Sequence, residues 1–261
     1  MHLQKCLTKI AALSLGAILL VTSAAQAAGN SKAKQVIDGL YCFGNRPAIR
    51  DLIIEMDCTN NDEQTGQLTP ASKDKIYFKA PNKLRVDATI IDPGGPMDQR
   101  QSIIIRDGVT MWHYLSTGQY PVKKQPDSSS PTANMPFGLQ RYPIDDTKNY
   151  EFGGQKTIEG VQGQEIVITN PQDDGDKHVV CVDMKRRVPL RHDYTRTDGD
   201  KHIAITVEYS AITALSDGRY FPFLLKIYED GKLQKVRAYR GVSLNVGLDD
   251  SFFNQMSGIM R

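Results

Sequence analysis

The stretch Lys201–Ala211 reads KHIAITVEYSA and alternates apolar with polar side chains along its whole length. Successive side chains of a β-strand point to opposite faces, so this alternation predicts a strand with one apolar and one polar face. The apolar side is formed by Ile203, Ile205, Val207, Tyr209 and Ala211. The pattern therefore points to a sheet with one buried face.

The same period of two recurs on both sides of this stretch and predicts about ten strands in all. Asp107-Gly108 and Asp230-Gly231 are turn pairs typical of tight hairpins, which indicates antiparallel neighbours. Residues 31–43 carry apolar side chains at helical spacing and predict one helix. We expect a mostly β (α+β) fold built on a single, strongly curved antiparallel sheet, closed or nearly closed. The other predicted strands are residues 52–58, 75–79, 83–91, 101–106, 110–115, 164–169, 177–183, 190–195, 219–228 and 232–246.

Residues 121–149 interrupt the strand pattern. They contain five prolines and the run Ser128-Ser129-Ser130. We expect a long loop with one helical turn near Phe137–Arg141, in a position where compact domains often carry lids or binding loops.

The start of the chain has the order of a secretory signal. Lys5 and Lys9 precede an apolar run from Ile10 to Val21, and the small residues Ala25-Gln26-Ala27 follow. A membrane anchor is the alternative, but the run is shorter than the roughly 20 residues that span a bilayer. We expect residues 1–27 to be removed, leaving a single domain of residues 28–261 in the periplasm.

The charge balance and the cysteines limit which partners and disulfides are possible. Without residues 1–27 the chain has 30 basic and 30 acidic residues, a balance that argues against nucleic acid as a partner. Cys42, Cys58 and Cys181 would lie in an oxidising compartment and allow three single-bridge pairings. We favour a Cys42–Cys58 disulfide with a free, buried Cys181, and three free thiols remain the alternative.

Catalytic and metal-binding patterns are few in this sequence. Ser31–Lys34 and Ser72–Lys75 match S-x-x-K without its partner motifs, and the acidic run Asp173–Asp176 fits a turn better than a calcium loop. His178, His192 and His202 fall on successive strands and could converge, but separate histidines on polar faces are the simpler interpretation. We expect no enzyme activity, no metal and no cofactor.

Apolar and aromatic side chains are dense on the predicted strands. A plain hydrophobic core explains any one of them. A curved sheet of about ten strands, however, encloses more volume than one short helix fills, and such barrels often hold one apolar ligand. We predict a cavity for an acyl chain lined by Phe78, Leu84, Val86, Ile103, Ile105, Trp112, Tyr114, Phe221, Phe223 and Leu225.

Four stretches, in order along the chain, carry a family resemblance. Tyr77–Arg85, YFKAPNKLR, and Ile105–Tyr114, IRDGVTMWHY, look like two hairpins of the LolA-like periplasmic lipoprotein-carrier superfamily, the outer-membrane lipoprotein-sorting proteins. Cys181–Gly199 resembles a further strand pair of that superfamily, and Asn245–Phe253 resembles its ending.

The resemblance implies an unclosed β-barrel of about eleven strands, lidded by helices, that carries the acyl chains of lipoproteins or lipids to the outer membrane by hand-over. It also implies an inner-membrane donor complex and an outer-membrane acceptor, and we expect a monomer. The sorting carrier has a lid-latching arginine directly before the proline of the first stretch, whereas this chain has Ala80 there. A sensor or regulatory protein that reads lipid or misassembled envelope protein on the same scaffold is the alternative function.

Overall fold

The structure, a computed structural model, describes residues 32–40, 49–62, 65–91, 99–116, 123–126 and 147–254. In these ranges it forms thirteen strands in one sheet, a helix over residues 32–38 and a short 3-10 helix. The elements are β1 (Asp51–Asn61), β2 (Leu68–Lys79), β3 (Lys83–Ile91), β4 (Gln99–Arg106), β5 (Thr110–Leu115), β6 (Lys123–Pro126), β7 (Asn149–Ile158), β8 (Val161–Asn170), β9 (Asp173–Asp183), β10 (Val188–Asp198), β11 (Lys201–Ala214), β12 (Tyr220–Glu229), β13 (Lys232–Leu244) and η3 (Asp250–Phe253).

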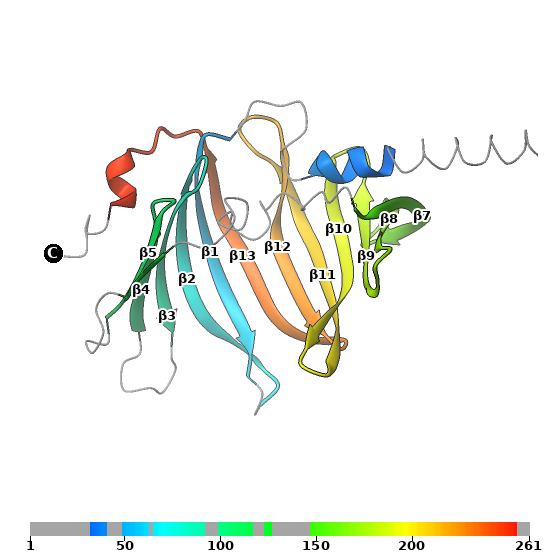
Figure 1. Ribbon diagram of the computed structural model, residues 1–261, viewed down its shortest axis with the longest axis horizontal. Coiled ribbons are helices and arrows are strands. Elements are labelled where there is room, and N and C mark those ends of the chain that lie inside the picture. Colours follow the sequence, from blue (N-terminus) through cyan, green and yellow to red (C-terminus); the bar gives the residue numbers. More distant parts are fainter. Residues whose placement is uncertain are drawn as a thin grey trace, which may run out of the picture.

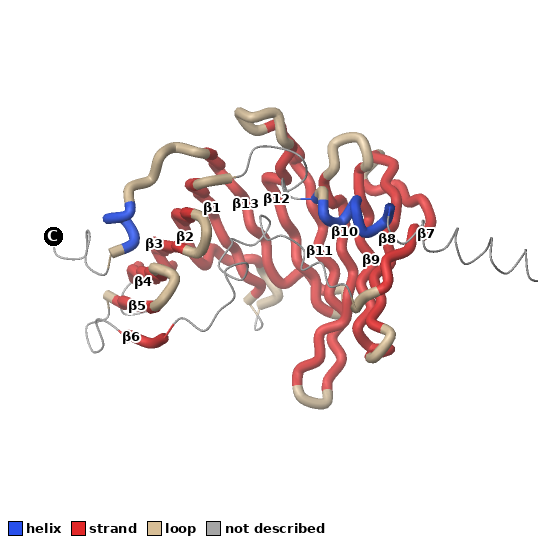
Figure 2. The backbone as a smooth tube through the Cα atoms, turned by 45° about the horizontal axis from the view of Figure 1, so that its top comes forward, coloured by secondary structure: helices blue, strands red, loops and turns tan. Residues whose placement is uncertain are grey.

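Every described strand pair is antiparallel, and the strand order is β6-β5-β4-β3-β2-β1-β13-β12-β11-β10-β9-β8-β7. The first and last of the described strands, β1 and β13, pair at the centre of the sheet, where Leu52 faces Leu244. The sheet curves strongly and stays unclosed, with β6 and β7 at its two edges (Figures 1 and 2). Among the residues described, no helix has the length and apolarity to cross a membrane.

The turns form where the sequence places residues suited to them. Asp230 and Gly231 both have positive φ, as a two-residue hairpin turn requires. Asp107 instead accepts hydrogen bonds through Oδ1 from the backbone N–H groups of Val109 and Thr110, each at 2.8 Å, and so holds the β4–β5 turn.

The mostly β prediction and the single curved antiparallel sheet are confirmed. The strand count of about eleven was too low, because the sheet has thirteen strands. β7 lies in a region to which the sequence assigned no strand, and β6 lies inside the predicted 121–149 loop. Of the predicted helix 31–43, the structure describes residues 32–40 and shows helix over 32–38. Residue 31, residues 41–43 and the helical turn expected near Phe137–Arg141 lie outside the described residues. The predicted helical lid is represented in the described part only by residues 32–38.

One face of the sheet carries two apolar clusters. The central cluster spans β1–β3 and β11–β13, and Leu52, Ile54 and Leu225 are completely buried in it. The helix cluster joins Ala33, Ile37 and Leu40 of the N-terminal helix to Tyr150, Ile166, Ile168, Val180 and Val182 of β7–β9. The face that carries both clusters is called the helix face below. The helix (blue in Figure 1) covers only the β7–β10 end of it (Figures 1 and 2).

The opposite face is covered in part by the end of the chain. Lys79 Nζ forms an ion pair with Asp250 at 2.6 Å and donates to the Leu248 carbonyl at 2.8 Å. The Phe252 ring packs on Tyr77 with centroids 5.4 Å apart, and Phe253 is fully buried. These contacts hold residues 245–253, the stretch that resembles the superfamily's ending, against β2 and β3.

Candidate functional site

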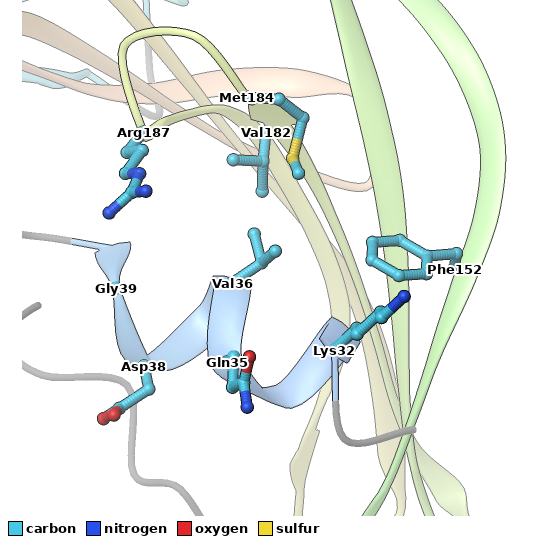
Figure 3. Close-up of a pocket in the computed structure, with 9 residues that line it drawn as sticks. All are labelled: Lys32, Gln35, Val36, Asp38, Gly39, Phe152, Val182, Met184 and Arg187. Carbon is cyan, nitrogen blue, oxygen red and sulfur yellow. The ribbon is translucent and has the colours of Figure 1, made fainter. Parts of the chain in front are cut away.

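A pocket of about 690 Å³ lies between the N-terminal helix and the end of the sheet formed by β7, β9 and the β9–β10 turn (Figure 3). That volume is within the roughly 300–1,000 Å³ range of ligand pockets in proteins. Its lining is Lys32, Gln35, Val36, Asp38, Gly39, Phe152, Val182, Met184 and Arg187. None of the ten residues predicted to line a cavity is in this set.

One side of the helix packs on the sheet, and an adjacent side lines the pocket. Ala33, Ile37 and Leu40 turn toward the sheet and are almost completely buried. Lys32, Val36 and Gly39 recur at spacings of three and four along an adjacent side, which faces the pocket.

Phe152 of β7 forms another wall. Gly153 and Gly154, which follow it, belong to a bulge that shifts the register of β7 against β8 between Phe152 and Gln155. The Gln164 side chain of β8 donates to the Gly153 carbonyl at 2.8 Å and to the Gly154 carbonyl at 3.2 Å, which satisfies both carbonyls. Phe152 keeps 42% of its surface exposed, and Figure 3 shows its ring directed toward the pocket.

The third wall is the turn after β9. Asp183 organises this turn by accepting hydrogen bonds from the backbone N–H groups of Lys185 and Arg186 at 2.9 and 3.1 Å. Burial raises the pKa of Asp183, but the Arg186 side chain and these backbone donors outweigh it and leave that pKa below its ordinary value. The turn presents the half-exposed Met184 and Arg187, while Val182 supplies a fully buried apolar floor.

The pocket therefore has a mixed lining, in which apolar and polar side chains contribute about equally. Val36, Phe152, Val182 and Met184 provide the apolar surface. The charged lining residues are two exposed cations, Lys32 and Arg187, and one carboxylate, Asp38. This arrangement suits an amphiphile, with its hydrocarbon part against the apolar side chains and its polar part near the charged ones.

A chain of polar groups crosses the helix face beside the pocket. Lys148 Nζ lies 2.7 Å from Asp176 Oδ2, and Asp176 Oδ1 lies 2.9 Å from His178 Nε2. His178 Nδ1 is 3.0 Å from His192 Nε2, and the Tyr194 ring stacks on both imidazoles. With Asp176 accepting from His178 Nε2–H, His178 Nδ1 is the acceptor for His192 Nε2–H.

Burial keeps this histidine pair neutral. It lowers the pKa of His192 to about 3, and the neighbouring His178 adds to the effect. Burial also lowers the pKa of His178, although the hydrogen bond to Asp176 opposes it. His192 lies across from Val180 of the helix cluster and Val207 of the central cluster, so the pair separates the two apolar clusters.

The sequence interpretation of these histidines was therefore wrong in part. His178 and His192 do converge, whereas His202 contacts Thr197 at the exposed end of the β10–β11 hairpin. Within the described ranges, no three His, Cys, Asp or Glu side chains gather as metal ligands would. The acidic run Asp173–Asp176 belongs to the start of β9 rather than to a turn, and its Asp176 anchors the polar chain.

The ten predicted cavity residues divide between the two faces. Six of them lie in or against the central cluster: Phe78, Leu84, Val86, Phe221, Phe223 and Leu225. The other four form a separate cluster: Ile103, Ile105, Trp112 and Tyr114. Directly paired residues share a face, and Ile105 pairs with Arg85 while the neighbouring Leu84 pairs with Arg106. The second group therefore lies on the face opposite the first, and the expectation that all ten enclose one cavity was wrong.

One contact between a hydroxyl and an imidazole was not expected from the sequence. Ser102 Oγ lies 3.0 Å from His113 Nε2 on neighbouring strands β4 and β5. A serine nucleophile needs a base that is oriented by a third group. In the part of the chain that the structure describes, no carboxylate is paired with His113, so the pair lacks that orienting acid.

Two thiols can be assessed. Neither Cys58 nor Cys181 is bonded to another described cysteine, both are buried, and burial raises the pKa of each thiol. Cys58 Sγ lies 3.8 Å from Asp74 Oδ2 as a donor. Cys42 lies outside the described residues, so the Cys42–Cys58 disulfide stays a prediction.

Three solved structures have a fold similar to this curved sheet. A DUF1329 family protein from Desulfovibrio piger matches with a TM-score of 0.57 and 16% identity, over 88% of this chain and 97% of that chain. A domain named for outer membrane lipoprotein sorting, from Vibrio parahaemolyticus, matches with a TM-score of 0.53 and 14% identity, over 86% and 94%. A LolA superfamily protein from Nitrosomonas europaea matches with a TM-score of 0.51 and 13% identity, over 87% and 97%. The chain has a LolA-like fold.

At these identities the likeness concerns the LolA-like fold alone. No protein-family model matches the sequence, and neither does any curated protein. The stretches that resemble the superfamily occupy defined places in the LolA-like sheet: residues 77–85 join β2 to β3, 105–114 join β4 to β5, and 181–199 join β9 to β10.

Proposed function

We propose that this protein binds acyl chains in the pocket beside its N-terminal helix and carries them, as part of lipoproteins or lipids, across the periplasm toward the outer membrane. The observation that supports this most is the 690 Å³ pocket, which places the apolar side chains Val36, Phe152, Val182 and Met184 close to the cations Lys32 and Arg187. The LolA-like fold and the secretory pattern of residues 1–27 agree with such a role.

Binding of this kind needs no covalent chemistry. Each CH₂ group moved from water into an apolar pocket contributes about 0.8 kcal/mol. An acyl chain can therefore be held through several buried CH₂ groups and still leave when an acceptor buries more of them. The donor and acceptor would be membrane complexes on either side of the periplasm, and the carrier would act as a monomer.

This chain lacks the lid-latching arginine of the sorting carrier. Ala80 stands at its position, and the basic residue before it, Lys79, is engaged by Asp250 and the Leu248 carbonyl of the tail. Release here would instead depend on the helix of residues 32–38, which borders the pocket and packs on the sheet through only a few apolar side chains.

A pair of charge substitutions tests the proposal. Phe152→Glu places a carboxylate in the pocket wall, and should weaken binding of a fluorescent fatty acid at least tenfold because a charge beside the acyl chain disfavours hydrocarbon. Leu68→Glu is the control, since Leu68 on β2 has the same 42% exposure and does not line the pocket. Equal binding by wild type and Phe152→Glu, or no binding by the wild type, would contradict the proposal.

A further inference from the structure

The edge strand β7 is open to pairing. It pairs only with β8 among the described strands, and residues 151–157 are all exposed. An exposed edge offers a row of backbone N–H and C=O groups to another extended chain.

The two edges of the sheet differ in how they are protected. β6, the other edge, has four residues and contains Lys123, Lys124 and Pro126, which are residue types that discourage strand addition. β7 has ten residues, one lysine and no proline. The bulge at Gly153-Gly154 interrupts it, so the regular part available for pairing is Gln155–Ile158.

The direction of the free backbone groups follows from the β7–β8 turn. Glu159 and Gly160 have φ values of 46° and 80° and form a two-residue turn that closes on the pair Ile158–Val161. Inward and outward backbone groups alternate along an antiparallel pair. Counting back from the turn, Thr157 and Gln155 direct their N–H and C=O groups away from β8, toward the open edge.

This edge adjoins the pocket, because Phe152 belongs to β7 and lines the pocket wall (Figure 3). We propose that β7 accepts an extended polypeptide segment as an additional strand, and that this segment carries the acyl group that enters the adjacent pocket. The inference rests on the proposed function and adds to it the surface that would hold the polypeptide part of the cargo, the open edge of β7.

The geometry favours this occupant over a second copy of the chain. Apart from Phe152, the exposed side chains of β7 are polar or absent: Asn149, Glu151, Gly153, Gly154, Gln155, Lys156 and Thr157. Pairing of two β7 edges would bring no apolar group except Phe152, which in each copy already belongs to the wall of its own pocket. An acylated segment supplies both a main chain for the edge and hydrocarbon for the pocket.

The test compares three probes: an N-palmitoyl peptide of small polar residues, the same peptide without its acyl group, and palmitate. Thr157→Pro removes an outward N–H, and proline is tolerated at edge strands. Thr157→Val keeps that N–H and is the matched control. We expect wild type and Thr157→Val to bind the palmitoyl peptide about tenfold more tightly than palmitate, equivalent to about 1.4 kcal/mol. Thr157→Pro should lose this preference while binding palmitate as before.

Hydrogen exchange gives a second readout. The palmitoyl peptide, but not palmitate, should slow exchange at Gln155 and Thr157. Equal affinity of the wild type for peptide and palmitate overturns this inference and leaves the proposed function intact, whereas failure to bind either overturns both. A wild-type dimer that Thr157→Pro dissociates, with no change in probe preference, also overturns it in favour of self-pairing.

Discussion

Lowering the pH from 7 to 5 should destabilise this fold through the buried histidine pair. His192 is 8% exposed, hydrogen-bonds His178 and lies between apolar residues of two clusters. Burial lowers its pKa from 6.5 to about 3, so the folded protein holds it neutral where the unfolded chain is protonated. Its contribution to stability is present above pH 6.5 and is lost as the pH falls from there toward 3.

The size of the effect follows from linkage. Each pH unit below the unfolded pKa costs about 1.4 kcal/mol per proton taken up on unfolding, so His192 accounts for about 2 kcal/mol at pH 5. For a protein of this size that corresponds to a fall in Tm of about 4–8 °C. His178, whose pKa is also lowered, acts in the same direction. Asp176 and Asp183 have pKa values below 3.8, so their contributions are lost at more acid pH than this window.

Urea unfolding at intervals between pH 7.5 and 5 measures the effect directly. The wild type should lose stability steadily below pH 6.5, and His192→Phe should remove most of that slope. His202→Phe, at the exposed end of a hairpin, controls for replacing a histidine by phenylalanine. A wild-type free energy of unfolding that stays flat over this range, or a slope that survives in His192→Phe, would refute the reasoning.

Further predictions concern packing and processing. Phe221→Ala should destabilise the fold by about 3–5 kcal/mol in urea unfolding, because the ring is 1% exposed, and Phe223→Ala should cost less because that ring is only partly buried. Gly163→Val should cost about 1–3 kcal/mol, because a Cβ at this position would overlap Cys181 Sγ; a stability equal to wild type would contradict the packing described. N-terminal sequencing of periplasmic protein should begin after Ala27, and an intact N-terminus would rule out the signal peptide.

The period-two pattern was enough to predict most of the sheet, because a strand that is buried on one face alternates apolar and polar residues along its sequence. β7 escaped detection because Gly153-Gly154 breaks the alternation at a bulge. The bulge is held by Gln164 from the next strand, so its stability is a tertiary contact that the local sequence does not contain. Tyr150, Phe152 and the Glu159-Gly160 turn were the available signals.

Which face a strand presents was harder to predict, because a shift of one residue in register exchanges its faces. Ile103, Ile104 and Ile105 are apolar on both sides of β4, so composition could not select one face. The pairing of Ile105 with Arg85 decides it, and that register depends on contacts between strands. The histidine pair has the same origin, since only the β9–β10 alignment brings His178 and His192 together.

Mass spectrometry of organic extracts from the intact purified protein tests the central claim most directly. An acyl-binding carrier should yield lipids with acyl chains in near-stoichiometric amount from the wild type and from Leu68→Glu. The yield from Phe152→Glu should be strongly reduced although the protein remains folded. Wild-type protein that yields no acyl lipid and takes up none when it is offered would contradict the account.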